Sequence, residues 1–313
     1  MRRPSWPAPS WPAPSWLPLP LLALPLLAAC GSTPAPAPPP PDETLGRAAR
    51  AGRLALELDR PAEAARLYGT ALGRARERDD AAAIADTGIG LAAADLARGR
   101  NAAALRTARE VRAELIRRAA PVPDALLLVE ALALYRTGDM AGAQSVAAQV
   151  TAEDADIARR TWFLRGLIAA GRGDQTALAE ARAALGEPEG RAFRADAREL
   201  AAAAALAGRD APGARRLAGE AGALRREGLD YRGLGRALAL EAEAAQRMGD
   251  NAAAADLLLR AGRGAAARNE FTEARRWLNA AEALARQARL PEIGNAARAS
   301  LRAMAERERD AAG

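Results

Sequence analysis

The segment Gly249-Asp250-Asn251-Ala252-Ala253-Ala254 joins a pair of turn-forming residues to an alanine-rich stretch, and the chain repeats this arrangement along its length. Six other blocks likewise place small or polar turn residues before an alanine-centred stretch: residues 59–64, 99–104, 138–143, 173–178, 209–214 and 269–274. The last residues of successive blocks lie 35 to 40 positions apart, except for a final step of 20. Internal repeats of about 34 to 40 residues indicate a solenoid built from helical hairpins.

The composition favours helices and excludes several kinds of chemistry. About 28% of the 313 residues are alanine, whereas β-branched and aromatic residues are scarce. The chain has no histidine and one cysteine, Cys30. It therefore has no Ser-His-Asp triad, no His-ligated metal, no internal disulfide and no cysteine zinc cluster. We expect no metal and no catalytic cofactor.

The blocks resemble the turn and second helix of the tetratricopeptide repeat (TPR), which place a small residue after a Gly-Asp-type turn and an apolar or small residue four positions later. The pairs that fit are Ala64 with Tyr68, Ala104 with Ala108, Ala143 with Ala147, Ala214 with Ala218, and Ala254 with Leu258. Trp162 and Gly166 match the Trp and Gly of the repeat's first helix, and Gly262 matches that Gly in the last unit. The resemblance covers roughly residues 44–288. It implies an all-α, right-handed superhelical solenoid of about six to seven TPR-like helical hairpins.

Physical chemistry supports this solenoid. Small residues at helix crossings let the two axes approach to about 8–10 Å. Rows of Leu and Val, such as Leu126, Val129 and Leu134, form an apolar stripe that one hairpin cannot bury alone, so neighbouring hairpins must stack. The 20-residue step suggests that a helix over residues 251–267 packs against both its neighbours. Leu290-Pro291 begins a last helix to about Glu308, and residues 289–313 are expected to form a C-terminal cap and tail.

The N-terminus carries a targeting signal. Met1-Arg2-Arg3 is basic, and residues 17–29 are apolar but shorter than the about 20 residues that span a bilayer as a helix. Leu27-Ala28-Ala29-Cys30 resembles the bacterial lipobox. The resemblance implies a signal peptide over residues 1–29, diacylglyceryl attachment to the Cys30 sulfur, cleavage before Cys30 and acylation of the new N-terminus. Such acyl chains (palmitate among them) anchor a protein stably when two or more are present.

The residues after Cys30 indicate a location and a spacer. By resemblance to Gram-negative lipoproteins, Gly31 rather than Asp after the lipidated Cys implies the periplasmic face of the outer membrane. Residues 30–43 are expected to form a Pro/Ala-rich tether, because residues 33–41 end in four consecutive prolines that favour polyproline II. At ~3.1 Å per residue, this tether would hold the solenoid roughly 40 Å from the membrane.

Two short motifs have ordinary structural explanations, and one catalytic motif is missing. Gly88-Ile89-Gly90-Leu91-Ala92-Ala93 matches G-x-G-x-x-A, but a dinucleotide site needs a preceding strand and this one follows a helical stretch. We interpret these as helix-packing glycines. Arg172-Gly173-Asp174 lies where other blocks place their turn. Lytic transglycosylases, which also use α-superhelical scaffolds, have a catalytic Glu followed by Ser, and this chain has no Glu-Ser dipeptide.

The leading functional hypothesis is a non-enzymatic, lipid-anchored periplasmic scaffold that binds a protein or peptide partner in cell-envelope assembly or secretion. The TPR register predicts that the groove is lined by Tyr135, Arg136, Phe163, Glu243 and Arg247, and aromatic and Arg side chains are common interface anchors. One alternative is an envelope protein whose Arg side chains bind anionic peptidoglycan or lipopolysaccharide. Another is a cell-wall hydrolase that uses carboxylates alone. Nucleic acid is not expected as a partner at this location.

Overall fold

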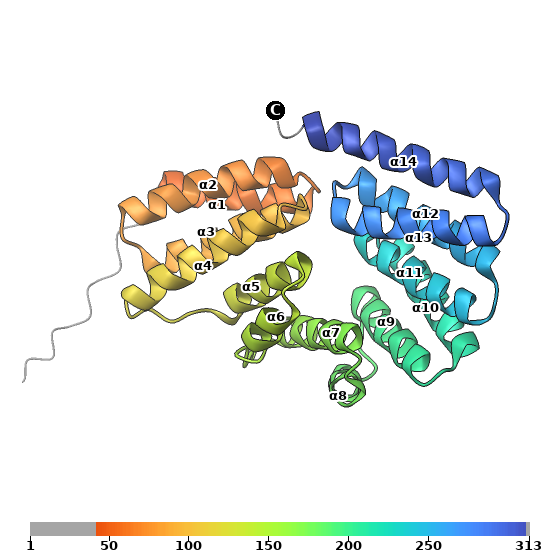
Figure 1. Ribbon diagram of the computed structural model, residues 1–313. Helices are drawn as coiled ribbons and strands as arrows, with labels where there is room; N and C mark the ends of the chain where they lie inside the picture. The colour runs from red at the N-terminus through yellow and green to blue at the C-terminus, as the bar shows by residue number, and fades with distance from the viewer. Residues whose placement is uncertain (1–41, 311–313) are drawn as a thin grey trace, which may run out of the picture. The chain divides into compact units, whose positions relative to one another are not determined.

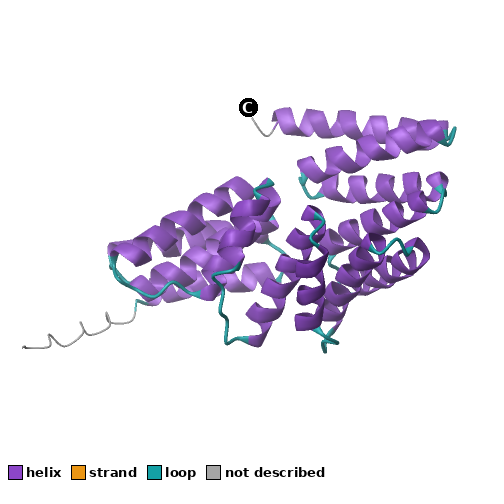
Figure 2. Cartoon of the chain, turned by 60° about the horizontal axis from the view of Figure 1, so that its bottom comes forward, coloured by secondary structure: helices purple, strands orange, loops and turns teal. Residues whose placement is uncertain are grey.

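The computed structural model describes residues 42–310, which form fourteen α-helices and no strand (Figures 1 and 2). The expected signal peptide and lipobox, Cys30 and residues 30–41 of the expected tether lie outside the described residues. The helices are α1 Glu43–Glu57, α2 Pro61–Glu77, α3 Ala81–Ala97, α4 Asn101–Arg117, α5 Asp124–Thr137, α6 Met140–Ala147, α7 Ala155–Arg172, α8 Gln175–Leu185, α9 Arg191–Ala207, α10 Ala211–Glu227, α11 Tyr231–Arg247, α12 Asn251–Ala267, α13 Phe271–Gln287 and α14 Pro291–Asp310.

The helices form seven consecutive hairpins, which confirms the predicted all-α solenoid. Every extensive contact between described helices joins neighbours or next-but-one neighbours in the chain, as expected for a stack without long-range pairing. Eight of these helices have 17 residues and are followed by short loops, so helix starts recur every 20 residues over α2–α4 and again over α9–α14. The shorter α6 and α8 account for the reduced spacing in the middle of the sequence.

The 20-residue step in the sequence is one helix and its loop. Residues 268–270 form the loop between α12 and α13, which separates the sixth hairpin from the seventh. As predicted, α12 packs against helices on both sides, α11 and α13. The last helix, α14, begins at Pro291 and packs against α13 and α12. Among residues 42–310, no helix combines the length and the apolar character needed to cross a membrane.

The Gly-Asp pairs end one helix and begin the next. Gly249 has a φ of +83°, a left-handed conformation that glycine adopts without a steric penalty. Asp250 then caps α12, and its Oδ1 accepts a hydrogen bond from the Ala253 N–H at 3.0 Å. Gly173 and Asp174 do the same before α8, with the Ala177 N–H 3.0 Å from the Asp174 carboxylate. The Arg-Gly-Asp tripeptide is therefore a helix-to-helix turn.

Alanines lie at the points of closest helix packing. The small residue of five blocks is completely buried in each case: Ala64, Ala104, Ala143, Ala214 and Ala254 have no exposed surface. Their partners four positions later are also buried, which confirms the predicted pairing: Tyr68, Ala108, Ala147, Ala218 and Leu258. Residues of this size let the helix axes approach closely, so the solenoid can be tightly packed although it contains few aromatic side chains.

The glycines of the G-x-G-x-x-A match are packing residues inside α3. A Cβ added at Gly88 would lie 2.5 Å from Val111 of α4, and one added at Gly90 would lie 2.4 Å from the Tyr68 ring of α2. Gly166 and Gly262, singled out by the TPR resemblance, approach Leu200 and Leu278 in the same way. These contacts confirm the interpretation as helix-packing glycines.

The Gly90 contact predicts a loss of stability on substitution. Gly90→Ala places a methyl group against the Tyr68 ring, so we expect the free energy of unfolding to fall by roughly 1–3 kcal/mol. Gly69 in α2 is the matched control, because a Cβ there meets nothing within 4 Å. Gly69→Ala should raise stability by about 0.5–1 kcal/mol. Urea denaturation of both variants checks this, and equal effects would contradict the assigned packing.

Candidate functional site

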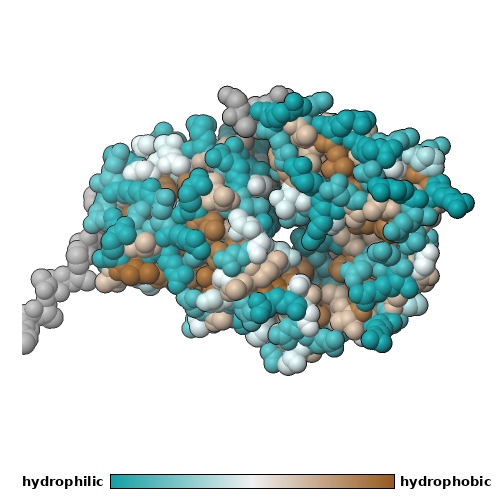
Figure 3. All heavy atoms as spheres, in the orientation of Figure 1, coloured by the Kyte–Doolittle hydropathy of each residue, from teal (hydrophilic) through white to brown (hydrophobic). Residues whose placement is uncertain are grey.

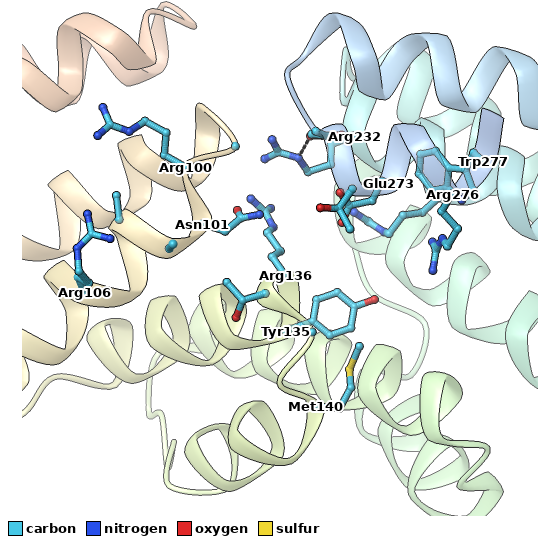
Figure 4. Close-up of a pocket in the computed structure, with 18 residues that line it drawn as sticks. Arg100, Asn101, Arg106, Tyr135, Arg136, Met140, Arg232, Glu273, Arg276 and Trp277 are labelled. Carbon is cyan, nitrogen blue, oxygen red and sulfur yellow. Dashed lines mark hydrogen bonds and ion pairs between the residues drawn. The ribbon is translucent and has the colours of Figure 1, made fainter. Parts of the chain in front are cut away.

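A cavity of about 700 Å³ lies where the first and last parts of the solenoid face each other. Its walls come from the start of α4, the end of α5, and the inner faces of α11 and α13. Figure 3 shows the hollow at the centre of the molecule, and Figure 4 shows the residues that surround it. The site thus combines residues more than a hundred positions apart in the sequence.

A second cavity of about 670 Å³ continues from the first. The two share four lining residues: Tyr135, Arg236, Arg276 and Trp277. The second cavity is walled by α7, α9, α11 and α13 and includes four leucines: Leu167, Leu206, Leu240 and Leu258. Together they form one continuous space, which we call the central groove, with odd-numbered helices forming most of its wall.

The first cavity is strongly cationic. Six arginines and two glutamates line it; the arginines are Arg100, Arg106, Arg136, Arg232, Arg236 and Arg276. Both glutamates come from α13 or the loop before it, and Glu270 is already paired with Arg232 and with Arg268, the latter at 2.9 Å. Arg276 lies over the Trp277 ring, 5.6 Å from its centroid. The cavity therefore carries more positive charge than its own carboxylates neutralise.

Arg136 shows the electrostatic cost of this arrangement. Burial, together with the nearby charges of Arg232 and Arg236, lowers the pKa of Arg136 to about 9. Its guanidinium donates a hydrogen bond to the Leu96 carbonyl oxygen at 2.9 Å. That carbonyl belongs to the C-terminal end of α3, where the helix dipole favours positive charge. An anion in the cavity would relieve the repulsion among these arginines.

Arg136 and Arg247 occupy equivalent positions in the repeat. Each lies at the end of the first helix of its hairpin and donates to a carbonyl at the end of the preceding first helix: Arg136 to Leu96 and Arg247 to Leu206. The spacings are 40 and 41 residues. Arg247 also forms an i,i+4 ion pair with Glu243 at 2.6 Å. These two arginines therefore join successive hairpins as well as lining the groove.

A buried ion-pair network supports the wall of the groove. Arg225 of α10 bonds to Asp196 at 2.5 Å and to Glu199 at 2.9 Å, both on α9. Glu199, which is 1% exposed, also accepts a two-pronged interaction from Arg236 of α11, at 2.6 and 3.2 Å. These bonds fix the rotation of α9, α10 and α11 and hold the Arg236 guanidinium at the junction of the two cavities.

The five residues predicted for the groove divide between two environments. Tyr135 and Arg136 line the first cavity, and Tyr135, Glu243 and Arg247 line the second. Phe163 lines neither of the two. Its ring instead packs beneath Arg225 and Arg236, each 5.5 Å from the ring centroid, and so supports the buried network from behind.

Of the six arginines that line the first cavity, only Arg136 was predicted from the sequence. On α11, Arg236, Leu240, Glu243 and Arg247 lie at i, i+4, i+7 and i+11. On α13, Glu273, Arg276, Trp277 and Ala280 lie at i, i+3, i+4 and i+7, which also places them on one helix face. This spacing on the first helix of each hairpin could have extended the prediction from Glu243 to Arg236. The contribution of Arg100 and Arg106 had no such signal, because they belong to the opposite end of the solenoid.

Three of the four glutamates that line the groove are held in ion pairs, and Glu273 is the fourth. Glu199 is bound by two arginines, Glu270 by two and Glu243 by one. Within residues 42–310, no group of three or more Asp, Glu, Cys or His side chains is placed to hold a metal ion. The groove offers guanidinium donors, apolar surface and aromatic rings, which are groups suited to binding.

Comparison with known proteins gives a distant structural likeness. No family model matches the chain, and no curated protein matches it. The fold is similar to a tetratricopeptide repeat protein from Parabacteroides merdae ATCC 43184, with 14% sequence identity and a TM-score of 0.48 over 82% of this chain and 99% of that one. It is also similar to the TPR2AB domain of yeast Sti1 in its complex with pHSP90, with 16% identity and a TM-score of 0.32 over 77% of this chain and 98% of that one. Both neighbours are TPR proteins, and neither likeness bears on what this chain binds.

The buried network predicts a distinctive pH dependence. Burial raises the pKa of Asp196 to about 6, an effect that Arg225 offsets only in part. Since the unfolded value is about 3.9, stability linked to Asp196 is present below about pH 4 and is lost as the pH rises to about 6. The asparagine of Asp196→Asn cannot ionise. Between about pH 4 and pH 7, we therefore expect the free energy of unfolding of this variant to rise by roughly 2–3 kcal/mol relative to that of the wild type, as measured by urea denaturation.

Asp250→Asn provides a control of opposite sign. The Ala253 N–H, with help from Arg215, lowers the pKa of Asp250, so its contribution to stability is present at neutral pH and is lost in acid. The free energy of unfolding of this variant should therefore decrease relative to that of the wild type as the pH rises. The same direction for both variants would show that the ionised Asp196–Arg225 pair is net stabilising, contrary to our assignment.

Proposed function

We propose that this protein is a non-enzymatic adaptor whose central groove binds an extended, acidic segment of a partner protein. The observation that carries the proposal is the excess of arginine in the first cavity, next to a second cavity in which four leucines lie among charged and amide side chains. A segment with carboxylates at one end and apolar side chains at the other would complement both. Tyr135 and Trp277 lie at the junction, where aromatic rings commonly anchor a ligand.

Electrostatics favours an anionic segment in particular. Arg106 and Arg276 are exposed to the cavity, and the structure gives neither of them an ion pair among the described residues. Guanidinium groups bind carboxylates by charge-assisted, often two-pronged hydrogen bonds. Clefts lined by one sign of charge also raise the association rate of oppositely charged ligands. We therefore infer binding that is fast and weakened by salt.

We further propose that the adaptor works at the bacterial cell envelope, tethered through lipid on Cys30. Support comes from the sequence alone: the lipobox-like Leu27-Ala28-Ala29-Cys30, Gly31 after it and the Pro-rich residues that follow. In this proposal the anchor lies in the outer membrane and the solenoid faces the periplasm, where the partner takes part in envelope assembly or secretion. A tether of roughly 40 Å would leave the groove accessible above the membrane.

The cationic cavity also gives a physical basis for the alternative ligand, an anionic envelope glycan or lipopolysaccharide. Arginine binds phosphate as readily as carboxylate. The leucines of the second cavity favour the peptide, because a polysaccharide offers few apolar groups to Leu206, Leu240 and Leu258. Cell-wall hydrolysis finds less support, since arginines hold three of the four glutamates of the groove and leave only Glu273, whereas acid–base hydrolysis needs a pair of carboxylates.

Charge reversal in the groove tests the adaptor proposal. The double variant Arg106→Glu, Arg276→Glu should weaken binding of a short oligoglutamate peptide at least about tenfold, because two cations facing the cavity become repulsive. Isothermal titration calorimetry at low and moderate salt measures this. The control, Arg66→Glu with Arg117→Glu, has the same net charge but changes exposed residues of α2 and α4 that line neither cavity.

Two outcomes would reject the proposed ligand. Equal binding by the groove variant and its control would show that oligoglutamate does not use the first cavity. Salt-sensitive binding of isolated lipopolysaccharide or peptidoglycan, with none of oligoglutamate, would assign the groove to the glycan alternative. In cells, crosslinking of the tagged protein followed by mass spectrometry identifies the partner.

Cys30→Ala tests the anchor independently of the groove. Without the thiol no diacylglycerol can be attached, so the protein should move from the membrane fraction to the soluble fraction and should lose labelling by radioactive palmitate. Cys30 is the only cysteine, so any thiol-linked lipid must be on it. Retention of the label in the variant would contradict lipidation at this position.

A further inference from the structure

The stacked hairpins follow a superhelical turn, which we call the helical turn. Its two ends meet along a narrow seam. We define the seam as residues 96–100, at the end of α3 and in its loop, facing Arg232 and residues 268–270. Arg232 donates a hydrogen bond to the Leu96 carbonyl at 3.2 Å, although the two residues are 136 positions apart. A Cβ added at Gly99 would lie 3.2 Å from the Asn269 carbonyl oxygen, so the two loops are in close approach.

The seam is held by few interactions. All extensive helix contacts join neighbouring or next-but-one helices, and none links α3 or α4 to α11, α12 or α13. The Arg232–Leu96 bond is the hydrogen bond that crosses directly, and no ion pair between described residues does so. Opening the seam therefore exposes little apolar surface, and its free energy must be small compared with that of separating stacked hairpins.

Like charges face each other across this seam. Arg136, on the α5 side, and Arg232, on the α11 side, both donate to the Leu96 carbonyl oxygen. Figure 4 shows them approaching one another beside Asn101, with Arg100 on the α4 side of the cavity. Repulsion between the two guanidinium groups opposes closure, although Glu270 offsets part of it through its ion pair with Arg232. The Leu96 carbonyl that both arginines share carries only a partial negative charge.

The start of α4 supplies further unsatisfied groups at the same place. Its first turn, Asn101 to Ala103, lines the cavity, and the N-cap residue Arg100 makes no side-chain cap, so first-turn N–H groups lack the usual side-chain acceptor. The Asn101 Oδ1 atom is buried without a hydrogen-bond partner. A ligand that brings carboxylates for the arginines and an N–H for Asn101 satisfies both, and an acidic peptide carries both groups.

We propose that carboxylates of the bound acidic segment bridge the seam, contacting Arg136 and the first turn of α4 on one side and Arg232 on the other, so that ligand binding closes the helical turn. This inference rests on the proposed function and adds a conformational coupling to it. The ligand binds the closed form better, because only there do both sides reach the same carboxylates, and it shifts the population toward closure.

Distance measurement across the seam tests the coupling in the full chain. Spin labels are attached at Ala97→Cys and Ala267→Cys in a Cys30→Ala background, since Ala97 and Ala267 are exposed, end α3 and α12 and lie on opposite sides of the seam. Short oligoglutamate should narrow the distance distribution and shift it to shorter values. Oligoglutamine, which lacks the charge, should leave it unchanged, and inorganic pyrophosphate tests phosphate as the anion.

Arg232→Gln separates the coupling from binding as such. The substitution removes the charge on one side of the seam, while Glu270 keeps its partner Arg268 at 2.9 Å, so the fold should persist. We expect oligoglutamate to bind this variant about tenfold or more weakly and to leave its distance distribution unchanged. Arg66→Gln on α2, outside both cavities, should behave as the wild type.

The possible results distinguish the two proposals. Tight oligoglutamate binding with an unchanged distance distribution, and equal affinity in Arg232→Gln, would overturn the coupling and leave the adaptor proposal standing. No binding of oligoglutamate by the wild type would overturn both. A response to pyrophosphate without one to oligoglutamate would show that the seam takes phosphate, and would overturn the assignment to a peptide carboxylate.

Discussion

The close approach of helices through alanine and glycine is the constraint on which this structure depends. Buried alanines such as Ala104 and Ala254 occupy the crossings, and at Gly90 even a methyl group would collide with the next helix. Small residues bury little apolar area each, so one hairpin gains too little to fold alone. Stability must then accumulate from the repeated contacts between hairpins, as in other quasi-one-dimensional folds.

Such a core leaves long polar side chains to organise the inner surface. Arginines reach from one hairpin to the carbonyls that end a helix of another, as Arg136 and Arg247 do, because helix C-termini attract positive charge. The buried network around Arg225 adds directional bonds where the alanine contacts are nearly featureless. The desolvation of these ions is costly, and we infer that they contribute the relative orientation of α9, α10 and α11 more than net stability.

Local features could be predicted from the sequence, and features that depend on distant contacts could not. The Gly-Asp turns and buried alanines follow from backbone geometry within one repeat, so Asp250 and Ala254 were identifiable from their blocks. Tyr135, Arg136, Glu243 and Arg247 lie on the groove because helical register places them there. The Phe163 ring instead packs against Arg225 and Arg236, and no residue near Phe163 in the sequence predicts those contacts. The closure of the turn brings Arg232 to Leu96 and depends on the summed rotation of every hairpin between them.

That summed rotation explains why electrostatic repulsion can affect the structure at the seam. Each hairpin contact is extensive and resists change, but small adjustments at several contacts add up at the two ends of the turn. The sum of these adjustments changes the distance across the seam. Only one direct hydrogen bond and one loop contact between described residues resist that change. Repulsion between Arg136 and Arg232, which the Glu270–Arg232 ion pair offsets in part, therefore acts where few contacts oppose it. The arginine-lined cavity thus lies at a place where few direct interactions join the two sides of the solenoid.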